Sequence, residues 1–209
     1  MKNKTKSKRR NLIVAAFAII MVFQLASFAN AVSGSDTPSY PYANDWTTGL
    51  WGDKYANANE NTGKLECYAY IYSFSCDAGA EVFARQTVSG SYRWRVEVEV
   101  SLKGYINNVG LYSGNELQIY IKLLDSDKNF IVEKEIYNAD RGPNTQEIVD
   151  FGTDTFTEYF STYRTNVRYI GVTFFVASGN GGKVCQDADH QTINDPAYVI
   201  VSSISWSNY

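Results

Sequence analysis

Hydrophobic and polar residues alternate most regularly in two stretches near the middle of the chain. Between residues 93 and 102, Trp, Val and Leu at the even positions alternate with Arg, Glu and Ser at the odd ones. Between residues 117 and 123, Leu and Ile alternate with Gln, Tyr and Lys. Successive side chains of a strand point to opposite faces, so a period of two predicts a strand with one buried face at each place.

The second of these stretches continues into a predicted β-hairpin. Residues 125–129 read Asp-Ser-Asp-Lys-Asn, which are turn formers whose short polar side chains can bond the local backbone. Residues 130–137 then resume a strand-like run. The sequence therefore predicts a hairpin over residues 117–137.

The rest of the chain favours strands over helices. Strand-like runs occupy residues 65–74, 80–88, 146–151, 167–177 and 197–206, and no stretch has sustained helical periodicity. Residues 104–114 are interpreted as a loop or a weak edge strand, and residues 155–163 as either a helical turn or a strand. Eight to ten strands with turns between them predict an all-β protein with a single two-layer antiparallel β-sandwich, for which a jelly roll is the favoured wiring.

The N-terminal part has the three features of a secretory signal. A basic head over residues 2–10 precedes an apolar run over 12–28 and the small-residue motif Ala29-Asn-Ala31. We therefore expect residues 1–31 to be a signal peptide, with a retained membrane anchor as the alternative. Residues 32–48 are expected to form an extended arm, and residues 49–209 the sandwich domain.

Removal of residues 1–31 changes the charge balance. The six basic residues of the head go with them, which leaves 13 Lys and Arg against 22 Asp and Glu, a formal charge of −9. Nucleic acids and anionic membrane surfaces are bound mainly through clustered basic side chains. The sequence thus argues against nucleic acid and, after cleavage of the signal, against a membrane as partners, and it predicts a secreted, extracellular or cell-surface protein.

Three cysteines in an exported chain predict one disulfide and one free thiol. If residues 65–74 form one strand, Cys67 and Cys76 lie roughly 30 Å apart along it, far beyond disulfide reach. Because Cys76 and Cys185 both lie in turn or loop sequence, their pairing is the expected one. With one histidine in the chain, a zinc site is not expected.

A resemblance to a known family is carried by two segments. Residues 88–104, V-S-G-S-Y-R-W-R-V-E-V-E-V-S-L-K-G, and residues 117–131, L-Q-I-Y-I-K-L-L-D-S-D-K-N-F-I, resemble the middle of jelly-roll carbohydrate-binding modules. The similar region covers about a quarter of the chain after residue 31. The resemblance implies a jelly-roll fold and a polysaccharide or glycan as partner.

Aromatic residues are the main candidates for binding such a ligand. Flat rings stack on the apolar faces of sugars, while phenol and indole groups add hydrogen bonds. The predicted ligand-binding residues are Trp46, Trp51, Tyr55, Tyr68, Tyr70 and Tyr72. Equally, these rings could fix the arm to the sandwich, and the tyrosine row could form an inner face beneath it.

Two acidic groups have spacings that suggest other chemistry. Glu97 and Glu99 share one strand face, so they could form the carboxylate pair of a glycosidase, but they alternate with arginines as on a solvated face. Asp125, Asp127 and Asn129 have the spacing that opens a calcium loop, but the remainder of that motif is missing. No catalytic residue or cofactor is predicted, and structural calcium is left open.

The sequence leaves three candidate functions. The favoured one is a secreted, non-catalytic β-sandwich that binds carbohydrate. The first alternative is a cell-surface or extracellular filament subunit, in which the arm of one copy adds a strand to the sheet of the next. The second is a glycoside hydrolase built on a lectin-like sandwich.

Overall fold

The computed structural model describes residues 32–71, 75–108, 114–141, 145–179, 181–189 and 191–209. The strands all belong to one compact unit, residues 33–209. The predicted signal peptide lies outside the described residues. Every regular element of the described part is a strand. A helix long and apolar enough to cross a membrane is not found among these residues.

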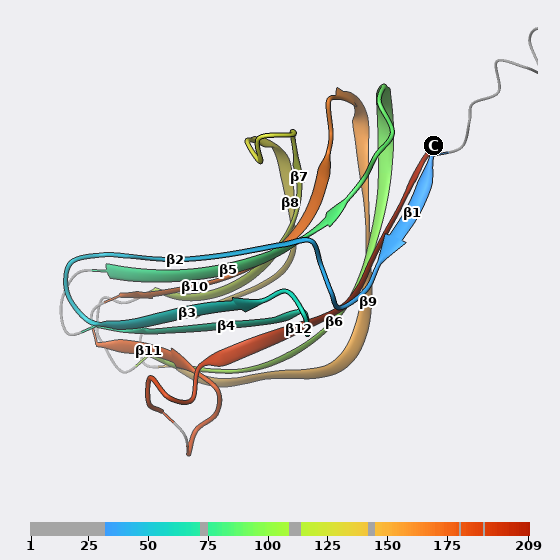
Figure 1. The fold of residues 1–209 in the computed structure, drawn as a ribbon. Helices are drawn as coiled ribbons and strands as arrows, with labels where there is room; N and C mark the ends of the chain where they lie inside the picture. The colour runs from blue at the N-terminus through green and yellow to red at the C-terminus, as the bar shows by residue number, and fades with distance from the viewer. Residues whose placement is uncertain (1–31, 72–74, 109–113, 142–144, 180, 190) are drawn as a thin grey trace, which may run out of the picture. The chain divides into compact units, whose positions relative to one another are not determined.

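Twelve strands form two antiparallel sheets that pack face to face (Figure 1). The seven-stranded sheet contains β1 (Ser33–Asp36), β3 (Asp53–Asn59), β4 (Lys64–Tyr70), β6 (Ser91–Asn108), β9 (Thr145–Thr165), β11 (Gly182–Cys185) and β12 (Ala197–Asn208). The five-stranded sheet contains β2 (Tyr42–Thr48), β5 (Ser75–Arg85), β7 (Asn115–Leu124), β8 (Phe130–Arg141) and β10 (Tyr169–Gly179). The predicted all-β sandwich is confirmed.

The strand order is that of a jelly roll. In the seven-stranded sheet β12 lies between β4 and β6, and β6 pairs with β9. In the five-stranded sheet the order is β2, β5, β10, β7, β8. The chain crosses to the other sheet after β1, β2, β4, β5, β6, β8, β9 and β10, and the crossings from β4 onward interlock the two sheets as two Greek keys do.

The alternating stretches form strands, as predicted. Residues 94–102 lie in β6, where Trp94, Val96, Val98 and Val100 are fully buried, and residues 117–137 form the β7–β8 hairpin. Leu117, Ile119 and Ile121 face the core from β7, and Ile170, Val172, Phe174 and Val176 face it from β10. One face of each strand is thus removed from water, which is the main source of stability in such a fold.

Two segments that the sequence pattern left undecided are strands, because strand pairing decides the structure where local patterns are weak. β6 continues to Asn108 into the segment interpreted as a loop or a weak edge strand, and β9 joins the predicted 146–151 strand to the 155–163 segment, for which a helical turn was the alternative. Along most of their lengths β6 and β9 are paired to each other. Hydrogen bonds between strands far apart in the sequence therefore stabilise strand structure where the local sequence pattern is weak.

The predicted arm contains two strands that pair within the same chain. β1 pairs with β12, and β2 pairs with β5 at the edge of the five-stranded sheet. Residues 32–48 show no alternation because an edge strand needs little side-chain burial once its backbone is paired. In this structure both strands add to the chain's own sheets.

Candidate functional site

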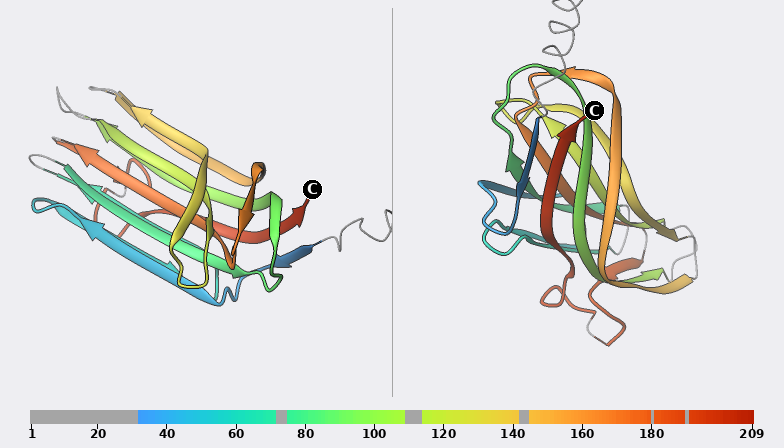
Figure 2. Two further views of the ribbon diagram at one scale, coloured as in Figure 1. Left: turned by 90° about the horizontal axis from the view of Figure 1, so that it is seen from above. Right: turned by 90° about the vertical axis from the view of Figure 1, so that its right-hand side faces the viewer.

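The outer face of the five-stranded sheet is the place where aromatic and polar side chains gather. The strands bend at one end, and this face lies on the inside of the bend (Figure 1). The turn between β7 and β8 crosses over the face toward β2 (Figure 2). Lys128 of that turn has its Nζ 3.9 Å from the centre of the Tyr42 ring. The face is therefore partly roofed on one side.

Two glycines allow aromatic rings to lie on this sheet. A Cβ placed on Gly79 would come within 2.2 Å of the Trp46 indole, and one on Gly171 within 2.7 Å of the Phe83 ring. Each ring therefore occupies the space that a side chain at the glycine would fill, which is a recurring reason for glycine inside a strand. Trp46 remains half-buried, whereas Phe83 is buried against Leu124 and Tyr169.

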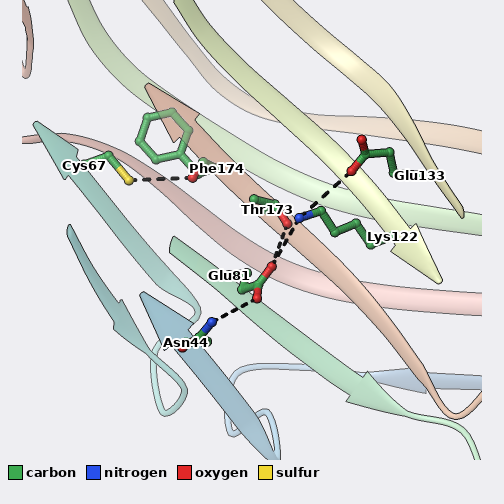
Figure 3. Close-up of polar contacts among 7 residues, drawn as sticks. All are labelled: Asn44, Cys67, Glu81, Lys122, Glu133, Thr173 and Phe174. Atoms are coloured by element: carbon green, nitrogen blue, oxygen red, sulfur yellow. Dashed lines mark hydrogen bonds and ion pairs between the residues drawn. The ribbon is translucent and has the colours of Figure 1, made fainter. Parts of the chain in front are cut away.

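A network of polar side chains crosses the face beside Trp46 (Figure 3). The carboxylate of Glu81 accepts hydrogen bonds from Asn44 Nδ2 at 3.2 Å, Thr173 Oγ1 at 3.0 Å and Lys122 Nζ at 3.5 Å. Lys122 Nζ also lies 4.0 Å from Glu133 and 5.6 Å from the centre of the Trp46 ring. Glu81 is only 8% exposed, so these donors stabilise a carboxylate largely withdrawn from water.

A pocket of about 280 Å³ lies next to this network. Its lining consists of Ala43, Asn44, Glu81, Phe83 and Lys128. An apolar ring, a carboxylate, an amide and an ammonium group therefore meet in one hollow. That combination can bind a ligand that has both hydroxyl groups and an apolar surface.

The opposite end of the same face is acidic. Burial, followed by the charges of Asp140, Asp77 and Glu135, raises the pKa of Glu116 above its ordinary value. Lys122 and Lys128 lie nearer the roofed side, so charge varies along the strands. The acidic end is unfavourable for an anionic ligand.

The predicted aromatic residues do not form one site. Of those that the structure describes, only Trp46 lies on this face, and Trp51 is in the β2–β3 connection with 63% of its surface exposed. Tyr68 packs against Tyr105 and Cys185 on the outer face of the other sheet, with Tyr55 and Tyr70 beside it. Tyr72 lies outside the described residues.

Tyr68 is not available as a binding platform. It is 2% exposed, so almost none of its ring is accessible to a ligand in the folded chain, as expected for the alternative of a covered face. The prediction depended on the period of two alone, which places residues on one face but does not tell what covers that face.

The expected Cys76–Cys185 disulfide is absent, and all three cysteines are free and buried. Cys76 belongs to β5 and its Sγ contacts the Tyr70 carbonyl, whereas Cys185 belongs to β11 and packs in the cluster with Tyr68 and Tyr105. The two residues thus lie in different sheets. Burial raises the pKa of Cys185 to about 12, so this thiol is held neutral and unreactive.

Cys67 and Cys76 also lie in different sheets, because β4 ends at Tyr70 and β5 begins at Ser75. The expected strand over residues 65–74 thus ends at Tyr70, and residues 72–74 lie outside the described residues. The Cys67 thiol points across the core toward the carbonyl of Phe174, 3.6 Å away (Figure 3). Burial first, with the charges of Asp45 and Glu66, raises the pKa of Cys67 well above its ordinary value.

The two acidic motifs serve local structure. Glu97 accepts hydrogen bonds from Arg95 and Thr157 on the seven-stranded sheet. Asp125 accepts hydrogen bonds from the backbone of Asp127 and Asn129 and from the Asn129 side chain, which closes the hairpin turn. These hydrogen bonds, first that of the Asn129 side chain, lower the pKa of Asp125. Within the described ranges, three or more His, Cys, Asp or Glu side chains nowhere gather closely enough to hold a metal ion.

Sequence reasoning did not identify most residues of this face. Asn44, Glu81, Lys122 and Thr173 lie on four different strands, and no local spacing relates them. The strand glycines Gly79 and Gly171 were the one available signal, since each marks a place where another group lies on the sheet.

The comparison with known proteins finds solved structures that are similar to this chain. No protein-family model and no curated protein matches the chain. Similar solved structures include the mannan-recognising carbohydrate-binding module TmCBM27, with 16% identity, coverage of 87% of this chain and 99% of that one, and a TM-score of 0.35. They also include TmCBM61 bound to β-1,4-galactotriose, with 11% identity, coverage of 90% and 94%, and a TM-score of 0.27.

Viral proteins are also similar at this level. The enzymatically active domain of tailspike protein 4 of bacteriophage CBA120 has 9% identity and a TM-score of 0.31, and the VP2 subviral particle of infectious bursal disease virus has 9% and 0.33. The comparison covers 84% and 86% of this chain but only 19% and 33% of those chains. Because these TM-scores are all below 0.5, the fold rests on the strand pairing of the chain itself.

Proposed function

We propose that residues 33–209 form a non-catalytic carbohydrate-binding domain whose ligand lies on the outer face of the five-stranded sheet. The observation that carries the proposal is Trp46, a half-buried indole that lies over Gly79 next to the Glu81 network. A ring held against the backbone is already ordered before the ligand arrives, so stacking a sugar on it costs little conformational entropy.

The polar network supports recognition of hydroxyl groups. Asn44, Thr173 and Lys122 each donate a hydrogen bond to Glu81, which fixes donors and an acceptor on one side of the ring. A ligand hydroxyl that replaces water at these groups finds partners already in place. Pre-organised polar groups beside an apolar ring match the alternation of C–H and O–H groups on a sugar.

The same network supports binding without catalysis. Glu81 is the carboxylate nearest the pocket, and three donors hold it in a largely buried position. A carboxylate that attacks or protonates a glycosidic bond needs a second carboxyl group at a defined separation, and the other carboxylate of this network, Glu133, is paired with the same Lys122 ammonium group as Glu81. Glu97 and Glu99, which have the right chemistry, lie on β6 in the other sheet.

We also propose that the chain acts outside the cell, as the composition of residues 1–31 supports. The net negative charge of the remaining residues is compatible with uncharged or amine-bearing glycans rather than with polyanions. Within this proposal the ligand is a neutral polysaccharide.

The test is binding of the purified full chain, with its N-terminus as expression leaves it, to a panel of neutral polysaccharides in affinity gels and by calorimetry. Trp46→Ala is expected to weaken binding at least about ten-fold, ~1.4 kcal/mol. Trp46→Phe keeps an apolar ring and should lose less. Tyr163→Ala, which removes an exposed aromatic from β9, is the matched control and should leave affinity unchanged. Equal affinity of Trp46→Ala and wild type, or release of new reducing ends from the polysaccharide, would overturn the proposal.

A further inference from the structure

A second pocket, of about 320 Å³, lies on the outer face of the seven-stranded sheet. Tyr55 of β3 and Glu66 of β4 contribute from the sheet, and Ile193, Asn194 and Pro196 contribute from the segment between β11 and β12. That segment extends from the side of this sheet that faces away from the five-stranded sheet (Figure 1). The pocket therefore shares no lining residue with the Trp46 face.

Its polar centre repeats the arrangement found around Glu81. Glu66 is paired in register with Asn57, as Glu81 is with Asn44. Asn57 Nδ2 donates to Glu66 Oε2 at 2.9 Å, and Lys64 donates to the other carboxylate oxygen. Lys64 Nζ also lies 4.6 Å from the centre of the Tyr198 ring, as Lys122 lies over Trp46. An amide, a carboxylate, an ammonium group and an aromatic ring thus form one cluster on each outer face of the sandwich.

The Glu66 carboxylate of this pocket is already paired with the Lys64 ammonium group. Burial by itself would raise the pKa of Glu66, but hydrogen bonds from Lys64 and Asn57 and the charge of Lys64 outweigh it and lower the pKa below its ordinary value. Each carboxylate oxygen has a second lone pair that can accept from a ligand hydroxyl. Burial first, and then the charges of Glu66 and Asp45, raises the pKa of Tyr55, so its phenol stays neutral and can donate.

The wall of the pocket is ordered by its own hydrogen bonds. Thr192 Oγ1 donates to Asp195 Oδ2 at 2.6 Å, and the backbone N–H of Asp195 donates to the Thr192 carbonyl at 3.0 Å. The N–H of Gln186 also donates to the carbonyl of Asp195 at 2.9 Å, which ties the far end of the segment to its start. A wall fixed in this way does not have to be ordered when a ligand binds.

From these observations we propose that the pocket lined by Tyr55, Glu66, Ile193, Asn194 and Pro196 is a second saccharide site, which takes one uncharged sugar residue of a glycan. The ring of Tyr55 with Ile193 and Pro196 supplies an apolar surface, and Glu66, Asn194 and the Tyr55 hydroxyl supply acceptors and donors. Its volume is at the small end of the roughly 300–1,000 Å³ of ligand pockets, which suits a single ring rather than a long chain.

The two sites are on opposite outer faces, so a chain with both can join two glycan strands. Linking two sites in one molecule raises avidity for a multivalent surface without a new contact. Binding at the second pocket depends on its own residues and does not require the Trp46 face to bind.

The experiment is calorimetric and NMR titration of the full chain with neutral tetrasaccharides of glucose, mannose and galactose, using the methyl resonances of Ile193 and the indole resonance of Trp46 as reporters. We expect two sites per chain, with both reporters shifting. Tyr55→Ala should remove the Ile193 response and leave the Trp46 response, and Trp46→Ala should leave the Ile193 response while the other site is lost. Glu66→Gln, which keeps shape but weakens acceptance, should reduce affinity at the second site about five-fold while the amide spectrum of the fold is unchanged.

The outcomes separate the second site from the proposed function. If the wild-type chain has one site, Tyr55→Ala leaves that site intact and Ile193 gives no response, the second site alone is overturned. If the wild-type chain has one site and only Tyr55→Ala removes it, the second site is supported and binding at the Trp46 face is overturned. A glucuronate or glucosamine tetrasaccharide that shifts Ile193 where neutral ones do not would overturn the assignment to uncharged sugars, and silence of both reporters toward the whole panel would overturn both proposals.

Discussion

On the outer face of the five-stranded sheet, Trp46 is half-buried and lies over Gly79, whereas on the outer face of the seven-stranded sheet Tyr68 is 2% exposed and packs against Tyr105 and Cys185. Both rings are on outward faces of neighbouring sheets. The difference between them is what covers the sheet, because Tyr68 lies in a packed cluster and Trp46 lies beside an open pocket. An outward aromatic residue is therefore half-buried beside a pocket on one face and part of a packed cluster on the other.

The largest effect should separate these two roles. Tyr68→Ala removes a fully enclosed ring and should lower the free energy of unfolding by about 3 kcal/mol. Trp46→Ala removes a half-buried ring on an edge strand and should lower it by only about 1 kcal/mol, while it abolishes most glycan binding. Urea unfolding measures both. Equal destabilisation by the two variants would contradict the assignment of Trp46 to ligand rather than to packing.

The next effect concerns the carboxylates of the two sheets. Glu81→Ala leaves Lys122, Asn44 and Thr173 without their shared acceptor and should cost about 2 kcal/mol of stability. Glu97→Ala breaks a more exposed pair with Arg95 and should cost less than about 0.5 kcal/mol. Thermal unfolding of the two variants beside wild type tests this, and a cost for Glu97→Ala as large as that for Glu81→Ala would show that burial does not distinguish them.

A smaller effect tests the glycine beneath the indole. Gly79→Ala places a methyl group where the Trp46 ring lies, so the ring must move and glycan affinity should fall about ten-fold, ~1.4 kcal/mol. Gly152→Ala is the matched control, because a Cβ there meets no atom within 4 Å. Calorimetric titration with the best polysaccharide of the panel gives the comparison. Unchanged affinity in Gly79→Ala would mean that the position of the indole on the sheet is not required.

The smallest effect is a pair of opposite pH dependences. Glu66 has a lowered pKa, so its stabilisation is present above the ordinary value of 4.5 and is lost as pH falls through the lower folded pKa. Glu116 has a raised pKa, so the folded state is favoured below 4.5 and loses that advantage as pH rises through the higher folded pKa. Glu66→Gln should thus be less stable than wild type at pH 7, and Glu116→Gln slightly more stable.

Both stability differences should vanish at acidic pH, that of Glu116→Gln below 4.5 and that of Glu66→Gln below the lowered folded pKa of Glu66. Each should be under about 0.5 kcal/mol, since both groups are partly exposed and screened by solvent. Unfolding at a series of pH values measures how the free energy of unfolding of each variant differs from that of wild type. A difference of the same sign for both variants at pH 7 would contradict the opposite environments inferred for Glu66 and Glu116.

Much of the fold was predictable because its information is local. The alternation in residues 93–102 and 117–123 and the turn at 125–129 predicted β6 and the β7–β8 hairpin from neighbouring residues alone. The pairing of Cys76 with Cys185 was wrongly predicted, because it depended on which sheet each residue enters. Trp46 was predicted from its chemistry as a binding residue, and the residues that lie around it were not predicted.

The amino-acid sequence by itself determined that the chain is built of strands, since a period of two sorts side chains onto the two faces of each strand before any pairing occurs. Only the tertiary structure decided which faces are covered and which residues meet. Glu81 and Thr173 are separated by 92 positions and become neighbours because β5 and β10 pair in register. Strand order arises from the packing of two sheets over a shared core, and that packing is a property of the whole chain rather than of any one segment.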